Sequence, residues 1–179
     1  AVKKNDKWGL IDKDGNFTLK PKYDSFVNYR DDLDVIYMTQ KNKSVYIDAK
    51  GNELFKDLKS NYSLQHFEEN GLSTFCKDPC DDVHNGVMKI PNQVIISPEF
   101  RWIEFKHGFI VAAKDDNHYA VYDTDGNTIV PYSEQYLFVV NRNLIAKSKK
   151  KKKSNGKYQF LDGKGKSISD SIYDFISYN

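Results

Sequence analysis

The sequence predicts an all-β fold built from about five degenerate antiparallel β-meander repeats of about 37 residues each. Three observations predict it. Asp-x-x-Gly turns return at near-regular spacing, apolar and polar residues alternate beside them, and the composition includes 12 Tyr and 11 Phe. Large flat side chains favour the half-buried faces of strands. Both a propeller-like ring and an open solenoid fit this pattern.

The first unit has the clearest pattern. Residues 7–24 are expected to form a strand, an Asp-Gly turn and a second strand, with apolar and polar residues alternating over residues 17–23. The Asp-Gly pair in the turn supplies the positive φ that tight hairpins need. The sequence therefore predicts a β-hairpin at the start of the array.

The turn signature returns in three further places. Its glycines, Gly15, Gly51, Gly126 and Gly165, are separated by 36, 75 and 39 residues. Because 75 is close to twice 37, we expect one more copy in the middle, and residues 86–100 supply it around a shortened turn at 91–92. The chain is predicted to be a single array over residues 1–179, with approximate units 1–40, 41–77, 78–114, 115–153 and 154–179.

A third apolar stretch completes each of the first four units, over residues 34–39, 72–76, 108–113 and 143–147. We expect antiparallel hairpins to join successive units into a continuous meander. Helical periodicity is weak, and residues 60–69 are the best helical candidate. Residues 2–5 either supply the strand that the last unit lacks and close a ring, or the chain is a piece of a longer array.

Aromatic side chains recur at corresponding places in the units, as a shared core demands. The residues expected to be mostly buried for this reason are Trp8, Tyr23, Phe26, Tyr46, Phe55, Phe100, Trp102, Phe105, Tyr122, Tyr136, Phe160, Tyr173 and Phe175. Five tyrosines fall outside the pattern and are candidates for contacts with sugars or peptides: Tyr29, Tyr37, Tyr62, Tyr132 and Tyr178.

The first unit, with Lys-Trp-Gly-Leu-Ile-Asp at 7–12, Asp-Gly at 14–15 and Pro-Lys-Tyr-Asp at 21–24, resembles the bacterial WG β-repeat, also called the KWG repeat. The other units resemble it more weakly, since the Trp-Gly pair occurs once. The resemblance implies a bacterial origin, all-β repeats, frequent export and use as an interaction module. It carries over no catalytic residues.

Charge and hydropathy narrow the function classes. The net charge is +2, from 27 basic and 25 acidic residues, so no field of one sign recruits nucleic acid. No stretch approaches the roughly 20 apolar residues of a transmembrane helix. The chain begins at Ala1 instead of Met, and loss of a signal peptide would place it outside the cytoplasm.

Two Asp-x-Asp-Gly-Asn strings, at 12–16 and 123–127, look like the start of a calcium loop. In such a loop the twelfth position carries a bidentate Glu. That position is occupied by Tyr23 after the first string and by Glu134 after the second. In the second string, the segment before Glu134 has a strand pattern instead of a helical one. We therefore expect both strings to be hairpin turns.

Cys76 and Cys80 lie close together, with His84 four residues further on. They fit a zinc site if a fourth ligand such as His66 joins them. They also fit a local disulfide in an exported protein, or two free thiols. The loop that holds them is longer than the loop at 40–43, and long loops of repeat arrays often gather on a binding face.

Five consecutive lysines occupy a connecting position late in the chain: Lys149, Lys150, Lys151, Lys152 and Lys153. The same position in other units is a short hairpin loop, which favours a solvated loop here. A nonspecific affinity for polyanions is the alternative.

No sequence motif indicates an enzyme or a cofactor. The four histidines share no pattern, and no Gly-x-Ser-x-Gly, His-Glu-x-x-His or phosphate-binding glycine loop occurs. We expect a non-enzymatic protein-interaction module of a bacterial envelope or secreted protein, periplasmic, cell-surface or secreted in preference to cytoplasmic. The alternative is binding of a carbohydrate or polyanion through surface tyrosines and the lysine loop. A hydrolase with two carboxylates from different strands is the third reading.

Overall fold

A computed structural model describes residues 1–31, 34–55, 62–67, 71–77, 80, 84–90, 93–116, 118–148, 157–168 and 170–173. In these ranges the chain forms strands, turns and one short 3-10 element, with no α-helix. The predicted all-β fold is confirmed. The described part of the chain also holds no helix with the length and hydropathy that a bilayer crossing requires.

The strands form five antiparallel sheets, and within each sheet the strand order follows the sequence. The first sheet contains β1 (Val2–Lys4), β2 (Lys7–Ile11) and β3 (Phe17–Tyr23); the second contains β4 (Ser25–Arg30), β5 (Val35–Gln40), β6 (Lys43–Ile47) and β7 (Glu53–Leu54). The third contains β8 (Tyr62–Phe67), β9 (Leu72–Lys77), β10 (Asn85–Lys89) and β11 (Gln93–Phe100). The fourth contains β12 (Trp102–Lys106), β13 (Phe109–Asp115), β14 (His118–Asp123) and β15 (Thr128–Ser133); the fifth contains β16 (Leu137–Asn141), β17 (Leu144–Ser148) and β18 (Tyr158–Asp162).

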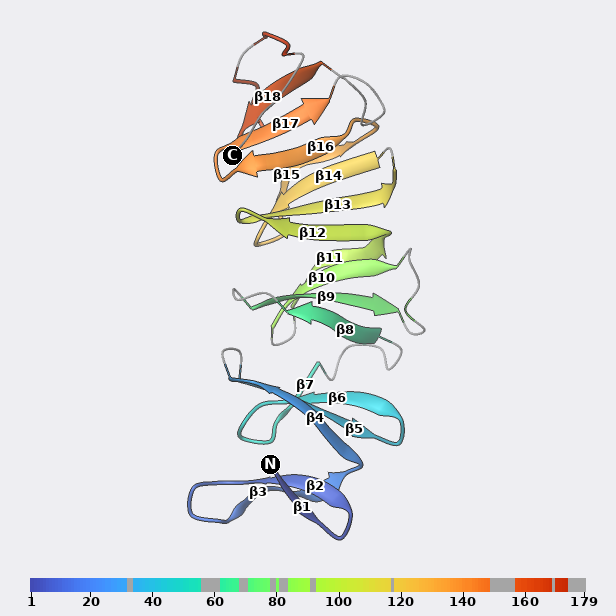
Figure 1. The fold of residues 1–179 in the computed structure, drawn as a ribbon, viewed down its shortest axis with the longest axis vertical. Helices are drawn as coiled ribbons and strands as arrows, with labels where there is room; N and C mark the ends of the chain where they lie inside the picture. Colours follow the sequence, from blue (N-terminus) through green and yellow to red (C-terminus); the bar gives the residue numbers. More distant parts are fainter. Residues whose placement is uncertain are drawn as a thin grey trace.

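The five sheets succeed one another along the long axis of the molecule, with the first and last sheets at opposite ends (Figure 1). Strand β1 pairs with β2 in the first sheet. The N-terminal residues therefore do not complete the last sheet, so the ring that was one of the two alternatives left open by the sequence is not closed by them. The fold is an open array of small meanders.

Two of the four links between successive sheets consist of a single residue. Asp24 alone separates β3 from β4, and Arg101 alone separates β11 from β12. Both links are fixed in the same way, because the Asp24 N–H donates to the Thr39 carbonyl and the Arg101 N–H to the Ala113 carbonyl, each at 2.8 Å. Each link follows the second strand of a hairpin, so sheet boundaries do not fall where the sequence units begin.

A strand that was not expected from the sequence opens each of the last four sheets, namely β4, β8, β12 and β16. The expected helix at 60–69 is also wrong, because β8 occupies part of that segment. Leu64 of β8 is buried and pairs with Phe75 of β9, and this pairing decides the local structure. The predicted third stretches are confirmed as β5, β9, β13 and β17.

The four Asp-x-x-Gly turns share one hydrogen-bonding pattern. In the first turn, one carboxylate oxygen of Asp12 accepts the N–H of Asp14 and the N–H of Asn16, each at 2.9 Å, while the Gly15 N–H donates to the Asp12 carbonyl at 3.2 Å. The glycines of the four turns have φ between 78° and 86°. The corresponding aspartates of the other turns are Asp48, Asp123 and Asp162. The repeated Asp and Gly are thus explained by turn geometry.

The glycine of the Trp-Gly pair is explained by a β-bulge. A Cβ atom at Gly9 would lie 2.4 Å from the Leu19 carbonyl oxygen and 2.8 Å from the Pro21 nitrogen, in the facing strand. A Cβ atom at Gly86 would likewise lie 2.6 Å from the Ile96 carbonyl oxygen. Both positions lie beside register shifts, where the bulged strand approaches closely.

The hydrophobic core lies between the sheets. Each of four buried clusters contains residues from two successive sheets and from no third sheet. The clusters are Leu10, Tyr23, Ile36, Met38 and Ile47 (sheets one and two); Val35, Tyr46, Phe55, Leu64, Phe75 and Met88 (two and three); Leu72, Val87, Ile96, Phe100, Ile110 and Ala112 (three and four); and Phe109, Val111, Val121, Val130, Leu137, Val139, Ile145 and Leu161 (four and five). Every sheet is therefore stabilised by its neighbours.

The recurring aromatic residues are only partly buried as expected. Tyr23, Tyr46, Phe55 and Phe100 are buried. Trp8, Phe26, Phe105, Tyr122, Tyr136 and Phe160 are half-buried. Trp102 is 45% exposed and Tyr173 is 43% exposed, so the expectation of burial is wrong for these two. Phe175 lies outside the described residues.

Candidate binding groove

A groove of about 490 Å³ lies between the third sheet and strand β12 of the fourth sheet. Three of its residues come from neighbouring strands of the third sheet, and the others from the link and β12. The lining residues are Gln65, Thr74, Asn85, Arg101, Trp102, Ile103, Glu104 and Phe105. The groove exists because the array places the edge strand of one sheet over the face of the preceding sheet.

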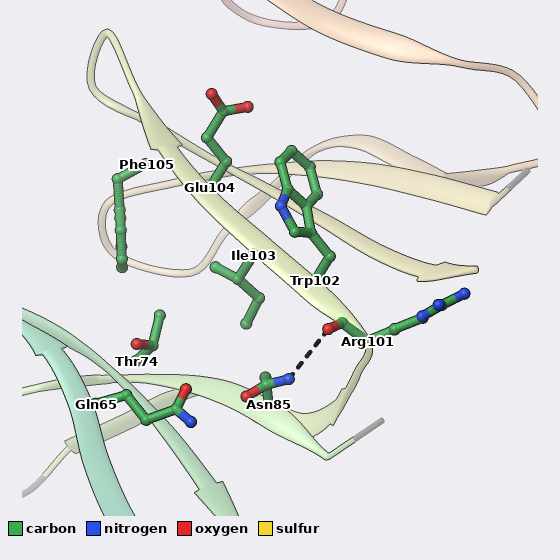
Figure 2. Close-up of a pocket in the computed structure, with 8 residues that line it drawn as sticks. All are labelled: Gln65, Thr74, Asn85, Arg101, Trp102, Ile103, Glu104 and Phe105. Atoms are coloured by element: carbon green, nitrogen blue, oxygen red, sulfur yellow. Dashed lines mark hydrogen bonds between the residues drawn. The ribbon is translucent and has the colours of Figure 1, made fainter. Parts of the chain in front are cut away.

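The alternation of β12 gives the groove two kinds of wall. Ile103 points toward the third sheet, whereas Trp102 and Glu104 point to the other side of the strand (Figure 2). Ile103 and Glu104 are half-buried, whereas Trp102 is largely exposed. The groove therefore offers an apolar floor and an accessible aromatic ring at its edge.

Polar groups fix one end of the groove. The Asn85 side-chain amide donates to the Arg101 carbonyl at 3.1 Å, which ties the third sheet to the link (Figure 2). The Arg101 guanidinium lies 3.7 Å from the carboxylate of Asp116 across exposed surface. Such an exposed pair contributes little to stability, so the guanidinium can exchange Asp116 for a ligand group at small cost.

A second cluster of aromatic and charged side chains lies around Tyr132, in strand β15 of the fourth sheet. The Lys114 ammonium lies 5.1 Å from the centre of the Tyr132 ring, and the His118 ring stacks on that ring at 5.5 Å. Lys114 also contacts Glu99 at 2.8 Å. This hydrogen bond to Glu99 is the main cause that raises the pKa of Lys114, and partial burial raises the pKa of Tyr132.

His118 lies between two carboxylates. Its Nδ1 is 2.7 Å from Asp115, and its Nε2 is 3.8 Å from Glu134. Within the described ranges no group of three His, Cys, Asp or Glu side chains is placed to hold a metal ion. The cluster is best described as a network of hydrogen bonds and polar contacts around an exposed tyrosine.

The tyrosines that the sequence singled out do not form one surface. Tyr29 of β4 is 46% exposed. Tyr37 of β5 stacks on Tyr46 at 4.9 Å, with its hydroxyl 3.2 Å from Ser44 Oγ. Tyr37 pairs with Asn28, so Tyr29 and Tyr37 project from opposite faces of the second sheet.

Other predicted residues fall partly or wholly outside the described residues. Tyr62 lies in β8, but its side chain and that of His66 are outside the description. Tyr178 and all five lysines, Lys149, Lys150, Lys151, Lys152 and Lys153, lie outside it as well. The lysine loop and its polyanion affinity therefore stay predictions.

Both candidate calcium loops are hairpin turns in the structure. The Asp123 carboxylate accepts the backbone N–H groups of Asp125 and Asn127, at 2.9 and 2.8 Å, as well as the Asn127 side-chain amide. Partial burial raises the pKa of Asp123, but these hydrogen bonds together outweigh it and the pKa is lowered. The carboxylate therefore closes the turn.

Cys76 and Cys80 are joined by a disulfide, with 5.3 Å between their Cα atoms. Cys76 lies at the buried end of β9, and Cys80 is exposed. This local disulfide is one of the three alternatives that the sequence left open.

Sequence reasoning did not identify the groove. Arg101, Ile103 and Glu104 were not singled out, and Trp102 was assigned to the core. The groove depends on β12, a strand with no clear alternation of apolar and polar residues. The usable signal is Trp102 itself, which lies two residues past the end of the predicted hairpin at 86–100.

The fold and the groove define an open β-repeat array with a groove between two successive sheets. Comparison with protein families adds one finding: residues 8–43 match the family model described as WG containing repeat. The resemblance expected from the sequence is confirmed over this segment. No curated protein matches the chain.

Several solved structures are similar to the chain over much of its length. A computationally designed protein, Ika8, shares 14% identity at a TM-score of 0.36, covering 90% of this chain and 53% of its own. Hsv2 of Kluyveromyces lactis shares 10% identity at 0.37, covering 75% and 44%. A eukaryotic initiation factor shares 11% identity at 0.42, covering 89% and 45%. The chain spans about half the length of these structures.

Proposed function

We propose that the protein is a non-enzymatic interaction module that binds an extended segment of a partner protein along strand β12. The observation that carries the proposal is Trp102, a large aromatic side chain that is 45% exposed at the edge of a groove of about 490 Å³. Trp and Arg are enriched among residues that dominate protein interfaces. Here Trp102 and Arg101 are consecutive.

The position of β12 suits an extended ligand. It is an edge strand, because its sheet runs in the order β12-β13-β14-β15. An edge strand can take up one further strand, whose main chain supplies hydrogen bonds while alternate side chains enter pockets. Ile103 would contact every second side chain of the partner, and Trp102 with Glu104 would contact the others.

The proposed location is the bacterial envelope or the outside of the cell. The disulfide between Cys76 and Cys80 supports this location, because disulfides persist in oxidising compartments and are rare in the cytosol. The frequent export implied by the WG repeat resemblance also supports it.

The test is an affinity capture from envelope and soluble fractions with three forms of the chain. Wild type is compared with Trp102→Ala and with Tyr29→Ala, which removes an equally exposed aromatic ring from β4 in another sheet. We expect a defined protein to be retained by wild type and Tyr29→Ala and lost with Trp102→Ala. Retention should survive high salt, since an apolar anchor and main-chain hydrogen bonds are little screened.

A peptide from the captured partner then locates the contact. NMR titration with that peptide should shift the amide signals of β12 and of Gln65 and Thr74 across the groove. A partner retained equally by Trp102→Ala would place the interaction elsewhere on the array. A partner released at modest salt would show that charge drives the binding, and both results contradict the proposal.

Carbohydrate binding is the second candidate. Its supporting observation is that the exposed Trp102 ring and the Glu104 carboxylate lie on one side of β12, at the edge of a groove that Gln65 also lines. An aromatic face with a few placed polar groups also suits a small polar ligand. Glycan binding that is lost in Trp102→Ala and competed by free sugar would favour this candidate over a protein partner.

A further inference from the structure

The turn between β12 and β13 determines which main-chain groups of β12 point out of the sheet. Its two central residues, His107 and Gly108, have φ of 50° and 82°, both positive as in a type I′ hairpin turn. Lys106 and Phe109 pair across this turn. The pair that closes a two-residue turn is hydrogen-bonded, and hydrogen-bonded pairs alternate with other pairs along an antiparallel ladder. Every second residue of β12, counted back from Lys106, therefore bonds to β13.

The remaining residues of β12 carry the outward main-chain groups. Trp102 and Glu104 are in phase with Lys106, and the register between β12 and β13 runs without a shift. The N–H and C=O groups of Ile103 and Phe105 consequently point away from the sheet. Because β12 is the edge strand, no strand of the described chain pairs with them on that side. A segment that joins β12 must form its main-chain hydrogen bonds with Ile103 and Phe105.

One face of β12 places a carboxylate beside an aromatic ring. Glu104 is half-buried, and among the described residues its carboxylate has no hydrogen-bond or ion-pair partner. Trp102 projects from the same side of the strand and is 45% exposed (Figure 2). This combination suits Lys or Arg, whose cation can meet the carboxylate while its stem or guanidinium lies against the ring. The side chain opposite Glu104 in a joined segment is then basic.

Cations on both sides of Glu104 restrict the register. Lys106 follows two residues later on the same face, and Arg101 directly precedes Trp102. Opposite charges that face each other on paired strands attract, and like charges destabilise the pair. A basic residue is therefore favoured opposite Glu104 and disfavoured opposite Lys106, where a shift by two residues would place it.

The other face of β12 is apolar. Ile103 and Phe105 pack against the buried cluster that contains Ile110 and Ala112 of the fourth sheet and residues of the third sheet. Successive side chains of a strand point to opposite faces, so the two residues that flank the basic one in a joined segment project to this side. There they meet the apolar floor of the groove, which favours apolar side chains.

We infer that the partner segment contains a Lys or Arg between two apolar residues, with the basic side chain held by Glu104 and Trp102. This inference rests on the strand addition proposed above and states the class of partner that β12 selects. The ion pair contributes selectivity, as charges at interfaces do. Most of the affinity comes from Trp102 and the main-chain hydrogen bonds, so binding still survives high salt.

The test is a selection from a library of short random peptides with four forms of the chain. Wild type and Trp102→Ala identify the peptides that need the groove. Glu104→Lys reverses the charge on β12, and Asp14→Lys makes the same charge change at an exposed turn residue of the first sheet. Circular dichroism verifies that each variant is folded.

We expect wild type and Asp14→Lys to select peptides with Lys or Arg between two apolar residues. Glu104→Lys should select Asp or Glu at that place. Replacing the basic residue of a selected peptide by Gln should weaken its binding to wild type about fivefold. The same replacement should not weaken binding to Glu104→Lys.

Amide hydrogen exchange measured by NMR locates the bound peptide. In the free protein the amides of Trp102 and Glu104 should be protected, and those of Ile103 and Phe105 should gain protection only when peptide is bound. Peptides that protect these two amides without a preference for a basic residue would overturn the inference and leave strand addition intact. If no peptide distinguishes wild type from Trp102→Ala, both the inference and the proposed function are wrong.

Discussion

Gly165 lies so close to Ile129 that a Cβ atom on the glycine would be 2.1 Å from the carbonyl oxygen of the isoleucine. Gly165 also has a φ of 78°. We expect Gly165→Ala to destabilise the protein by at least about 2 kcal/mol, because backbone strain and a clash between sheets add together. The measurement is the free energy of unfolding in urea.

Gly15→Ala is the matched control for that substitution. Gly15 has a similar φ of 84° in a turn of the same type, but nothing lies within 4 Å of its Cβ position. Its substitution should cost about 1 kcal/mol from backbone strain alone. Equal losses in the two variants would show that contact between sheets does not constrain the turn at Gly165.

The turn aspartates predict a loss of stability in acid. Hydrogen bonds hold the pKa of Asp123 below its ordinary value despite partial burial, and the Asn16 backbone N–H is the main cause that lowers the pKa of Asp12. A lowered pKa stabilises the fold above the unfolded-state pKa of about 3.9, and this contribution is lost as pH falls through the folded pKa. The urea concentration at the midpoint of unfolding should therefore decrease as the pH is lowered below about 4.

Asp123→Ala tests the role of the carboxylate in the turn directly. Because the Asp123 carboxylate accepts two backbone N–H groups, the substitution should cost about 1 kcal/mol at neutral pH, as for loss of a helix cap. Asp125→Ala removes only the exposed ion pair with Lys89 and should cost less than about 0.5 kcal/mol. If the two variants are equally stable, the turn is not held by the carboxylate.

Tyr46 predicts a loss of stability in alkali. Burial raises the pKa of its hydroxyl to about 12, and neighbouring Tyr37 adds to the rise. For an acid whose folded pKa is raised, the contribution to stability is full below the unfolded pKa of about 10 and is lost as pH rises through the folded value. Tyr46→Phe should therefore unfold at a higher pH than wild type, as followed by circular dichroism during alkaline titration.

The disulfide predicts a difference between oxidised and reduced protein. It closes a loop with a sequence separation of 4, and chain-entropy arguments give about 2 kcal/mol for so short a loop. Reduction of wild type should lower the free energy of unfolding by this amount. Cys80→Ser should already be at the lower value and should not respond to reductant, so a response in that variant would contradict the assignment.

The hairpins were predictable because their determinants are local. Asp12 and Gly15 specify a turn through bonds within five residues, and the same spacing revealed the other turns. The degenerate unit at 86–100 was predictable from spacing. Gly86 in this unit corresponds to Gly9 in the first unit, because at both positions a Cβ atom would clash with a carbonyl oxygen of the facing strand. These elements need no information from the rest of the chain.

The groove was not predictable because its determinants are not local. Strand β12 is an edge strand with one residue, Arg101, between it and the preceding sheet, and Trp102 is exposed only because the array leaves that side open. In sequence, Trp102 looks like another core aromatic. Its exposure depends on how far one sheet extends over the next, which no short pattern encodes.

The strictly sequential strand order in each sheet has a consequence for folding kinetics. Each strand pairs with a strand adjacent in sequence, so the entropy cost of closing the loop between two paired strands is small. Contact order is then low for an all-β protein, and we expect folding faster than that of a β-sandwich of equal length. Because each cluster joins only two sheets, structure should spread between neighbours and should fray from the two ends first.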